Sequence, residues 1–186
     1  MQKNSFKIYS FVSEFNLSDL HQLSKDICII YRNYGNINHL ENILKLKEYC
    51  KNIGTKIYLS NDIKLSIKLR LDGVYIPSFN NDLSHLSYSL KEKFNIIGSA
   101  HTLREIKIKE KQKVKKIFLS SLFKKNKNYL GINRFKLLKK LTKKDVIALG
   151  GVSLRNIKKL NLVNSLSFAG ISYFEQKKGP KKGPFK

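Results

Sequence analysis

The chain has 186 residues and two cysteines, Cys28 and Cys50, which lie far apart, so one domain with free, packed thiols is expected rather than a disulfide scaffold. The net charge is +24, but only five of the 37 basic residues are arginine, the residue that nucleic-acid readers favour, so we attribute the charge to solvated lysines and do not expect nucleic acid as a partner. No apolar run has the length of a membrane span, and the opening MQKNSFKIYSFVSEF has no signal-peptide core, which predicts a cytoplasmic protein without membrane attachment.

Short apolar runs alternate with segments of helical periodicity along the chain. We expect strands at residues 7–12, 27–32, 55–59, 72–76, 95–98, 116–120, 146–149 and 166–171. We expect helices near residues 16–25, 38–53, 63–69, 82–93, 102–112, 133–141 and from Ser153 onward. This alternation predicts an α/β fold, a single TIM (β/α)₈ barrel over residues 1–174 without a regular eighth helix; an open doubly wound sheet is the alternative. The basic segment 175–186 is of low complexity and is expected to be disordered.

The strand expected at 146–149 ends in two glycines, Gly150 and Gly151, and Ser153 follows shortly after them. Glycine lets the backbone approach a ligand closely, and a helix that begins at Ser153 would offer unpaired N–H groups to an anion. An ordinary tight turn between a strand and a helix has the same composition. Because the loops after strands seven and eight of a (β/α)₈ barrel commonly hold phosphate, we favour an anion site here.

Polar residues follow most of the other expected strands. In a barrel the carboxyl ends of the strands surround one mouth, where active sites lie. The set is cationic and poor in paired carboxylates, which suits a phosphorylated ligand. Its members are Arg32, Asn61, Asp62, Ser78, Ser99, His101, Ser120, Ser121, Lys124, Lys125, Lys127, Gly150, Gly151, Ile171 and Ser172.

Six segments in chain order resemble the thiamine-phosphate synthase/TenI superfamily: YLSND, LDGVYI, IIGSAHTLREI, IFLSSLF, VIALGGVSLRNI and FAGISYF. The resemblance extends from Lys7 to Phe174. It implies a TIM barrel that binds a hydroxymethylpyrimidine pyrophosphate and a thiazole phosphate, with Mg²⁺ as cofactor. In the reaction that it implies, the pyrimidine loses pyrophosphate and the thiazole nitrogen captures the resulting cation, which gives thiamine phosphate.

The resemblance also implies roles for individual residues. Arg32 and Asn61 would bind the pyrophosphate, Asp62 would hold Mg²⁺, and Ser99 would contact the leaving group. Backbone N–H groups would surround the thiazole phosphate at Gly150, Gly151, Ile171 and Ser172. In place of the family's Thr-x-Thr-Lys loop after strand six, the substrate contacts would come from Lys125 and Lys127.

The chain departs from the family pattern on the pyrophosphate side. Ile30 and Tyr34 stand where the family has a Gln and a Lys beside the arginine, and Ser78 replaces a Gln after the fourth strand. The second metal carboxylate is missing at its register, and Asp82 is displaced from it by two residues.

The roles of two residues, and the function of the protein, each have alternatives. His101 could act as the acid/base of a TenI-like thiazole tautomerase, which needs no metal, or could cap or pack at a helix start. Asp62 could bind Mg²⁺ or act as the N-cap of the following helix. The protein could also be a non-catalytic binder of phosphorylated ligands or nucleic acid. Self-association into a homo-oligomer stays open.

Overall fold

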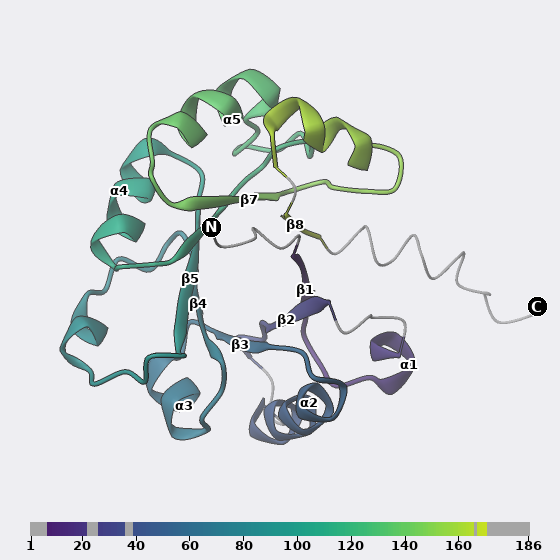
Figure 1. The fold of residues 1–186 in the computed structure, drawn as a ribbon, viewed down its shortest axis with the longest axis vertical. Coiled ribbons are helices and arrows are strands. Elements are labelled where there is room, and N and C mark those ends of the chain that lie inside the picture. The colour runs from purple at the N-terminus through teal and green to yellow at the C-terminus, as the bar shows by residue number, and fades with distance from the viewer. Residues whose placement is uncertain (1–6, 22–25, 36–38, 166, 171–186) are drawn as a thin grey trace, which may run out of the picture.

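Residues 7–21, 26–35, 39–165 and 167–170 are described by the structure, a computed structural model. Their strands form a closed barrel in which each strand runs parallel to its neighbour and β8 returns to β1 (Figure 1). The strands are β1 (Ile8–Val12), β2 (Ile27–Tyr31), β3 (Ile57–Ser60), β4 (Gly73–Ile76), β5 (Asn95–Ala100), β6 (Lys116–Leu119), β7 (Asp145–Leu149) and β8 (Phe168–Ala169). The predicted barrel is therefore confirmed, and the open sheet is excluded.

Helices surround the barrel on its outside (Figure 1). They are α1 (Leu17–Leu20), α2 (His39–Ile53), α3 (Ile63–Lys68), α4 (Leu103–Lys111) and α5 (Gly131–Lys140). The side chains of Asn16, Asp62 and Thr102 cap α1, α3 and α4 by accepting hydrogen bonds from backbone N–H groups of the first turn. Local capping signals thus place these helix starts, while residues 22–25 of the first predicted helix lie outside the described residues.

The helix predicted at 82–93 is wrong, because only the short 3₁₀ helix η1 (Ser84–Ser87) forms there. The side chains of this segment bond to nearby groups instead of supporting an α-helix. Ser84 donates its N–H and its hydroxyl to the Asp82 carboxylate, and Ser87 Oγ donates to the Ser84 carbonyl. Serine and aspartate compete in this way with helical hydrogen bonding.

The helix predicted to begin at Ser153 is also wrong. The segment turns irregularly and then forms the 3₁₀ helix η2 (Ile157–Val163). Asn156 explains the difference, since its Oδ1 accepts from the Ser153 N–H at 2.9 Å and its Nδ2 donates to the Gly151 carbonyl at 2.8 Å. A side chain therefore takes the N–H group that the prediction assigned to an anion.

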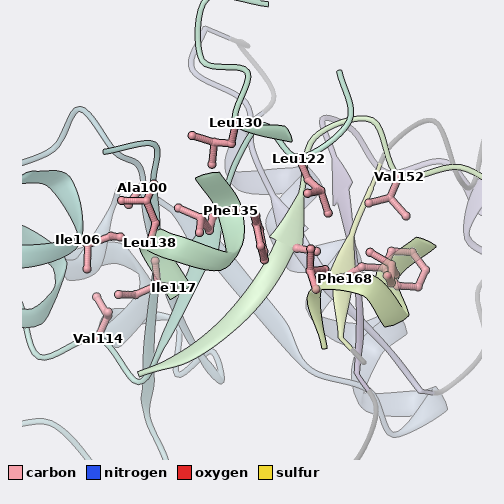
Figure 2. Close-up of a cluster of buried hydrophobic side chains, with 14 of the residues drawn as sticks. Ala100, Ile106, Val114, Ile117, Leu122, Leu130, Phe135, Leu138, Val152 and Phe168 are labelled. Atoms are coloured by element: carbon pink, nitrogen blue, oxygen red, sulfur yellow. The ribbon is translucent and has the colours of Figure 1, made fainter. Parts of the chain in front are cut away.

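The core has two layers, one inside the barrel and one between the barrel and its helices. Inside, aromatic rings pack edge to face around Phe118, whose centroid lies 4.9 Å from that of Tyr9 and 5.5 Å from that of Tyr75. Outside, Phe135 and Leu138 of α5 pack against the strands (Figure 2). The barrel interior is filled, so ligands have access at its ends and not through its centre.

Cys28 and Cys50 are free and buried, as predicted, and burial raises the pKa of both thiols. Within the ranges that the structure describes, no helix combines the length and the apolar character needed to cross a bilayer.

Candidate functional site

A pocket of about 380 Å³ opens beside the carboxyl ends of β2 and β3. Its lining comprises Asn33, Tyr34, Gly35, His39, Ser60, Asn61 and Asp62. The Tyr34 hydroxyl lies 2.7 Å from Ser60 Oγ, and its ring stands edge to face with Phe79 at 6.2 Å. Both rings are exposed, Tyr34 at 58% and Phe79 at 67%. Tyr34, which stands where the resemblance would place a lysine, therefore lines this pocket with an exposed aromatic ring.

Asn61 and Asp62 occupy the turn that joins β3 to α3. Asn61 has a left-handed backbone with φ of 67°, and its N–H donates to the Tyr75 carbonyl at 2.8 Å. Asn61 Oδ1 accepts a hydrogen bond from Asn80 Nδ2 at 2.7 Å. Asp62 Oδ1 accepts from the Leu65 N–H at 2.9 Å, so the N-cap role is present in the structure. Asparagine tolerates the left-handed region better than other residues with a side chain, which explains its place in this turn.

Arg32 and Ser99 both act on Tyr75 at the barrel mouth. The Arg32 guanidinium carbon is 4.9 Å from the centre of the Phe11 ring, a cation–π contact that holds an exposed cation over the barrel interior. Burial raises the pKa of Tyr75 to about 12, while a hydrogen bond with Ser99 and the charge of Arg32 act in the opposite direction. Two predicted site residues thus interact with the same buried tyrosine, and the sequence did not indicate this connection.

The donors available for Mg²⁺ are few. Among the described residues, no group of three or more His, Cys, Asp or Glu side chains could hold a metal ion. Asp82 does not substitute for the missing carboxylate, because both of its oxygens accept hydrogen bonds from Ser84. Asp62 Oδ1 accepts the capping hydrogen bond, so Oδ2 is the oxygen that could bind a metal ion. Since Mg²⁺ commonly takes one or two carboxylates together with substrate phosphates, this single carboxylate fits an ion that arrives with a pyrophosphate.

His101 lies at the end of β5, directly before α4. Its backbone N–H donates to Glu105 Oε2 at 2.6 Å, and its Nδ1 lies 3.0 Å from the same oxygen. Thr102 caps the helix by accepting from the Glu105 N–H. The helix-opening role of His101 is therefore present. The contact of Nδ1 with the Glu105 carboxylate also orients the imidazole and leaves Nε2 as the ring nitrogen for a substrate.

The glycine turn after β7 is packed against the β6–α5 loop. Gly150 and Gly151 have φ of 95° and 78°, which favours glycine at both positions. A Cβ on Gly150 would lie 2.4 Å from Ser121 Oγ, and one on Gly151 would lie 2.5 Å from the Lys124 backbone nitrogen. The Phe123 N–H also donates to the Gly150 carbonyl at 2.8 Å. Packing alone therefore requires both glycines.

The remaining predicted residues of the thiazole-phosphate side are less defined. Lys125 and Lys127 are exposed on the β6–α5 loop that covers the glycine turn. Ile171 and Ser172 lie outside the described residues. The role of these four residues, like that of the glycines, stays a prediction.

Three residues near the site were not identified from the sequence. Ser60 bonds to Tyr34, Asn80 bonds to Asn61, and Lys109 bonds to the Asn80 carbonyl at 2.7 Å. Asn80 had a detectable signal, since it stands at the register of the missing metal carboxylate. Lys109 had none, because a lysine in a very basic helix looks like a solvated residue.

The closed barrel, with polar side chains gathered at the carboxyl ends of its strands, defines a (β/α)₈ protein with a candidate site for a phosphorylated ligand. The thiamine monophosphate synthase family profile matches residues 25–174, and the chain belongs to that family.

Its relatives include the thiamine-phosphate synthase of Helicobacter pylori (strain HPAG1), which is 29% identical over 127 residues covering 63% of this chain and 56% of the relative. That of Pelagibacter ubique is 28% identical over 141 residues covering 74% and 68%. The chain thus aligns with little more than half the length of the Helicobacter relative.

Solved structures show the same fold. Thiamine phosphate pyrophosphorylase from Pyrococcus furiosus superposes with a TM-score of 0.72 at 13% identity, covering 91% of both chains. The enzyme of that name from Bacteroides thetaiotaomicron gives a TM-score of 0.62 at 14% identity, covering 97% of this chain and 90% of the other. At such identities the likeness concerns the fold alone.

Proposed function

We propose that the protein condenses hydroxymethylpyrimidine pyrophosphate with thiazole phosphate to give thiamine phosphate and pyrophosphate. The observation that carries the proposal is the gathering of Arg32, Asn61, Asp62 and Ser99 around one barrel mouth in a chain of this family. Three strands, β2, β3 and β5, supply these residues at their carboxyl ends.

In this proposal the protein binds and orients two substrates and stabilises a leaving group. Charge builds up on the pyrophosphate as its bond to the pyrimidine methylene breaks, and the Arg32 guanidinium and the Asn61 amide would stabilise that charge. Mg²⁺, bound by Asp62 and the pyrophosphate, would supply further positive charge. The methylene carbon then forms its new bond to the thiazole nitrogen, so the two rings must lie in line.

The thiazole phosphate would bind on the opposite side of the mouth. We assign it to Gly150, Gly151, Ile171 and Ser172, with Lys125 and Lys127 as additional substrate-binding cations. Support comes from the two exposed lysines on the loop that packs over the glycine turn. Because lysine carries a compact charge on a flexible stem, these contacts would attract the phosphate more than they would fix its orientation.

Turnover tests the proposal directly. The protein, both substrates and Mg²⁺ should yield thiamine phosphate, detected by liquid chromatography and mass spectrometry. Product should vanish with EDTA and with Asp62→Asn. Absence of product from the wild-type protein with both substrates at millimolar concentration would refute the synthase assignment.

A TenI-like thiazole tautomerase is the second candidate, favoured by the His101–Glu105 pair and by the single carboxylate at the metal position. An imidazole oriented by a carboxylate can transfer a proton without a metal. Tautomerase turnover should survive EDTA and Asp62→Asn, and should fall with His101→Gln. Loss of activity with EDTA would exclude this candidate.

A further inference from the structure

A buried lysine lies behind the pyrophosphate side of the site. Lys109, on α4, is 0% exposed. Its Nζ donates to the Asn80 carbonyl at 2.7 Å and to Gln112 Oε1 at 2.8 Å. Neither partner is a carboxylate. Burying an ammonium group against uncharged partners costs free energy, so this lysine is not an ordinary solvated surface residue, and a role for it has to be sought.

The helix and strand around Lys109 shape its path toward the mouth. Lys109 Nζ reaches the backbone carbonyl of Asn80, which follows the carboxyl end of β4, so the end of this side chain lies toward the mouth. Gly98 of β5 leaves room for this stem, because a Cβ at that position would lie 3.0 Å from Lys109 Cδ. The small residue on the strand and the long residue on the helix therefore fit each other.

Asn80 connects this lysine to the candidate site. Its carbonyl accepts from both Lys109 Nζ and Gln112 Nε2, while its own Nδ2 donates to Asn61 Oδ1 at 2.7 Å. Because its side-chain oxygen Oδ1 accepts this hydrogen bond, Asn61 presents its side-chain NH₂ group to a ligand. An anion requires a donor, so this bond gives the Asn61 amide the orientation that a pyrophosphate needs.

We propose that Lys109 is a positioning residue for the pyrophosphate side: it holds Asn80, and Asn80 orients the Asn61 amide toward the anion. The ligand in this statement rests on the proposed function, whereas the chain of hydrogen bonds does not. In this chain the register of the second metal carboxylate holds the asparagine Asn80, and the buried Lys109 bonds to the backbone carbonyl of that residue.

Titration calorimetry with inorganic pyrophosphate and Mg²⁺ tests the proposal. Lys109→Met keeps the stem but removes the ammonium, and should weaken binding about five- to tenfold. Lys139→Met is the matched control, because Lys139 likewise donates to two uncharged acceptors, the backbone carbonyls of Val163 and Asn164. The control should bind as the wild-type protein does. Equal affinities for Lys109→Met and the wild-type protein would overturn the proposal.

Two further variants show whether the effect passes through Asn61. Asn80→Ala removes the bond to Asn61 but leaves the backbone carbonyl that Lys109 needs, so it should fold and should lose a similar factor in affinity. In an Asn61→Ala background, Lys109→Met should have little further effect, because residues that act through one another are not additive. Full additivity, or normal binding by Asn80→Ala, would contradict the relay.

A readout without substrate separates this inference from the proposed function. In the wild-type protein, the side-chain NH₂ signals of Asn61 and Asn80 are expected to be distinct in ¹⁵N-resolved NMR spectra, with protected Asn80 protons. Lys109→Met should shift both signals and speed exchange of the Asn80 protons, whereas Lys139→Met should not. Unchanged signals would refute the relay, whereas wild-type protein that shows the relay but binds no pyrophosphate would refute only the proposed function.

Discussion

The two sides of the barrel mouth are built differently. On the side that we propose binds pyrophosphate, the pyrophosphate side, the side chains of Arg32, Asn61 and Ser99 interact with other side chains. On the glycine-turn side, formed by Gly150 and Gly151, backbone packs directly against the backbone of the β6–α5 loop. A substitution on the first side can therefore remove one interaction, while a substitution on the second side displaces a loop.

This difference changes what each side can reveal about function. The glycines are needed for packing whether or not a phosphate binds, so their mutation is a poor probe of binding. The pyrophosphate side permits changes that alter charge with little effect on the core. Mutations on the two sides should separate stability from ligand binding.

The largest effect is expected at the glycine turn. Gly150→Ala places a Cβ 2.4 Å from Ser121 Oγ on a backbone with φ of 95°, and should lower the free energy of unfolding by about 3 kcal/mol. Gly54→Ala is the control, because its φ is 72° but no atom lies within 4 Å of the added Cβ, and it should cost only about 1 kcal/mol. Urea denaturation measures both, and similar losses would show that the loop yields to the new side chain.

Arg32→Ala should affect ligand binding and spare the fold. Loss of a charge-assisted contact should weaken pyrophosphate-bearing ligands by about 1.5–3 kcal/mol and leave thiazole phosphate unaffected. Arg70→Ala removes the same charge after α3, at the other end of the barrel, and should change neither. Calorimetry with both ligands checks the result; an equal loss for both ligands would abolish the distinction between the two sides.

Lys109 should make the stability of the fold depend on pH. Burial lowers the pKa of Lys109 to about 8, and the nearby charge of Glu105 opposes this shift. The unfolded chain then holds more protons than the folded chain between about pH 8 and pH 10, so stability due to Lys109 should rise with pH in this window, by roughly 1–3 kcal/mol. The difference in unfolding free energy between the wild-type protein and Lys109→Met isolates this term, and a pH-independent difference would contradict it.

Asp62→Asn should have the smallest effect on stability, because it keeps the N-cap and changes only the proposed metal ligand. Asparagine is as good an N-cap as aspartate, so Asp62→Asn should change the free energy of unfolding by less than about 0.5 kcal/mol, whereas Asp62→Ala should cost about 1 kcal/mol. Both should abolish turnover that depends on Mg²⁺. Thermal denaturation and the turnover assay check the pair; Mg²⁺-dependent turnover by Asp62→Asn would leave the residue as a cap alone.

Local patterns in the sequence were enough for the strands, most helices and the order of the site residues around the mouth. Alternating apolar runs predict buried parallel strands, and capping residues such as Asp62 and Thr102 mark helix starts because their hydrogen bonds are formed within three residues. Once eight such units close into a barrel, the ends of the strands meet at one mouth. Arg32 and Ser99 could therefore be placed near each other without knowledge of any contact.

The failures came where side-chain hydrogen bonds outweigh the periodicity of the sequence. The Asn156 side chain bonds to Ser153 and Gly151 in place of the helix expected at Ser153. In the segment expected to be a helix at 82–93, Ser84 bonds to the Asp82 carboxylate, and Gln112 Nε2 donates to the Asp82 carbonyl. The pairing of Asn80 with Asn61 likewise joins two loops that are nineteen residues apart. The bonds of Asn80 to Asn61 and of Gln112 to Asp82 depend on where the closed barrel brings each loop, and no local periodicity or capping signal records that position.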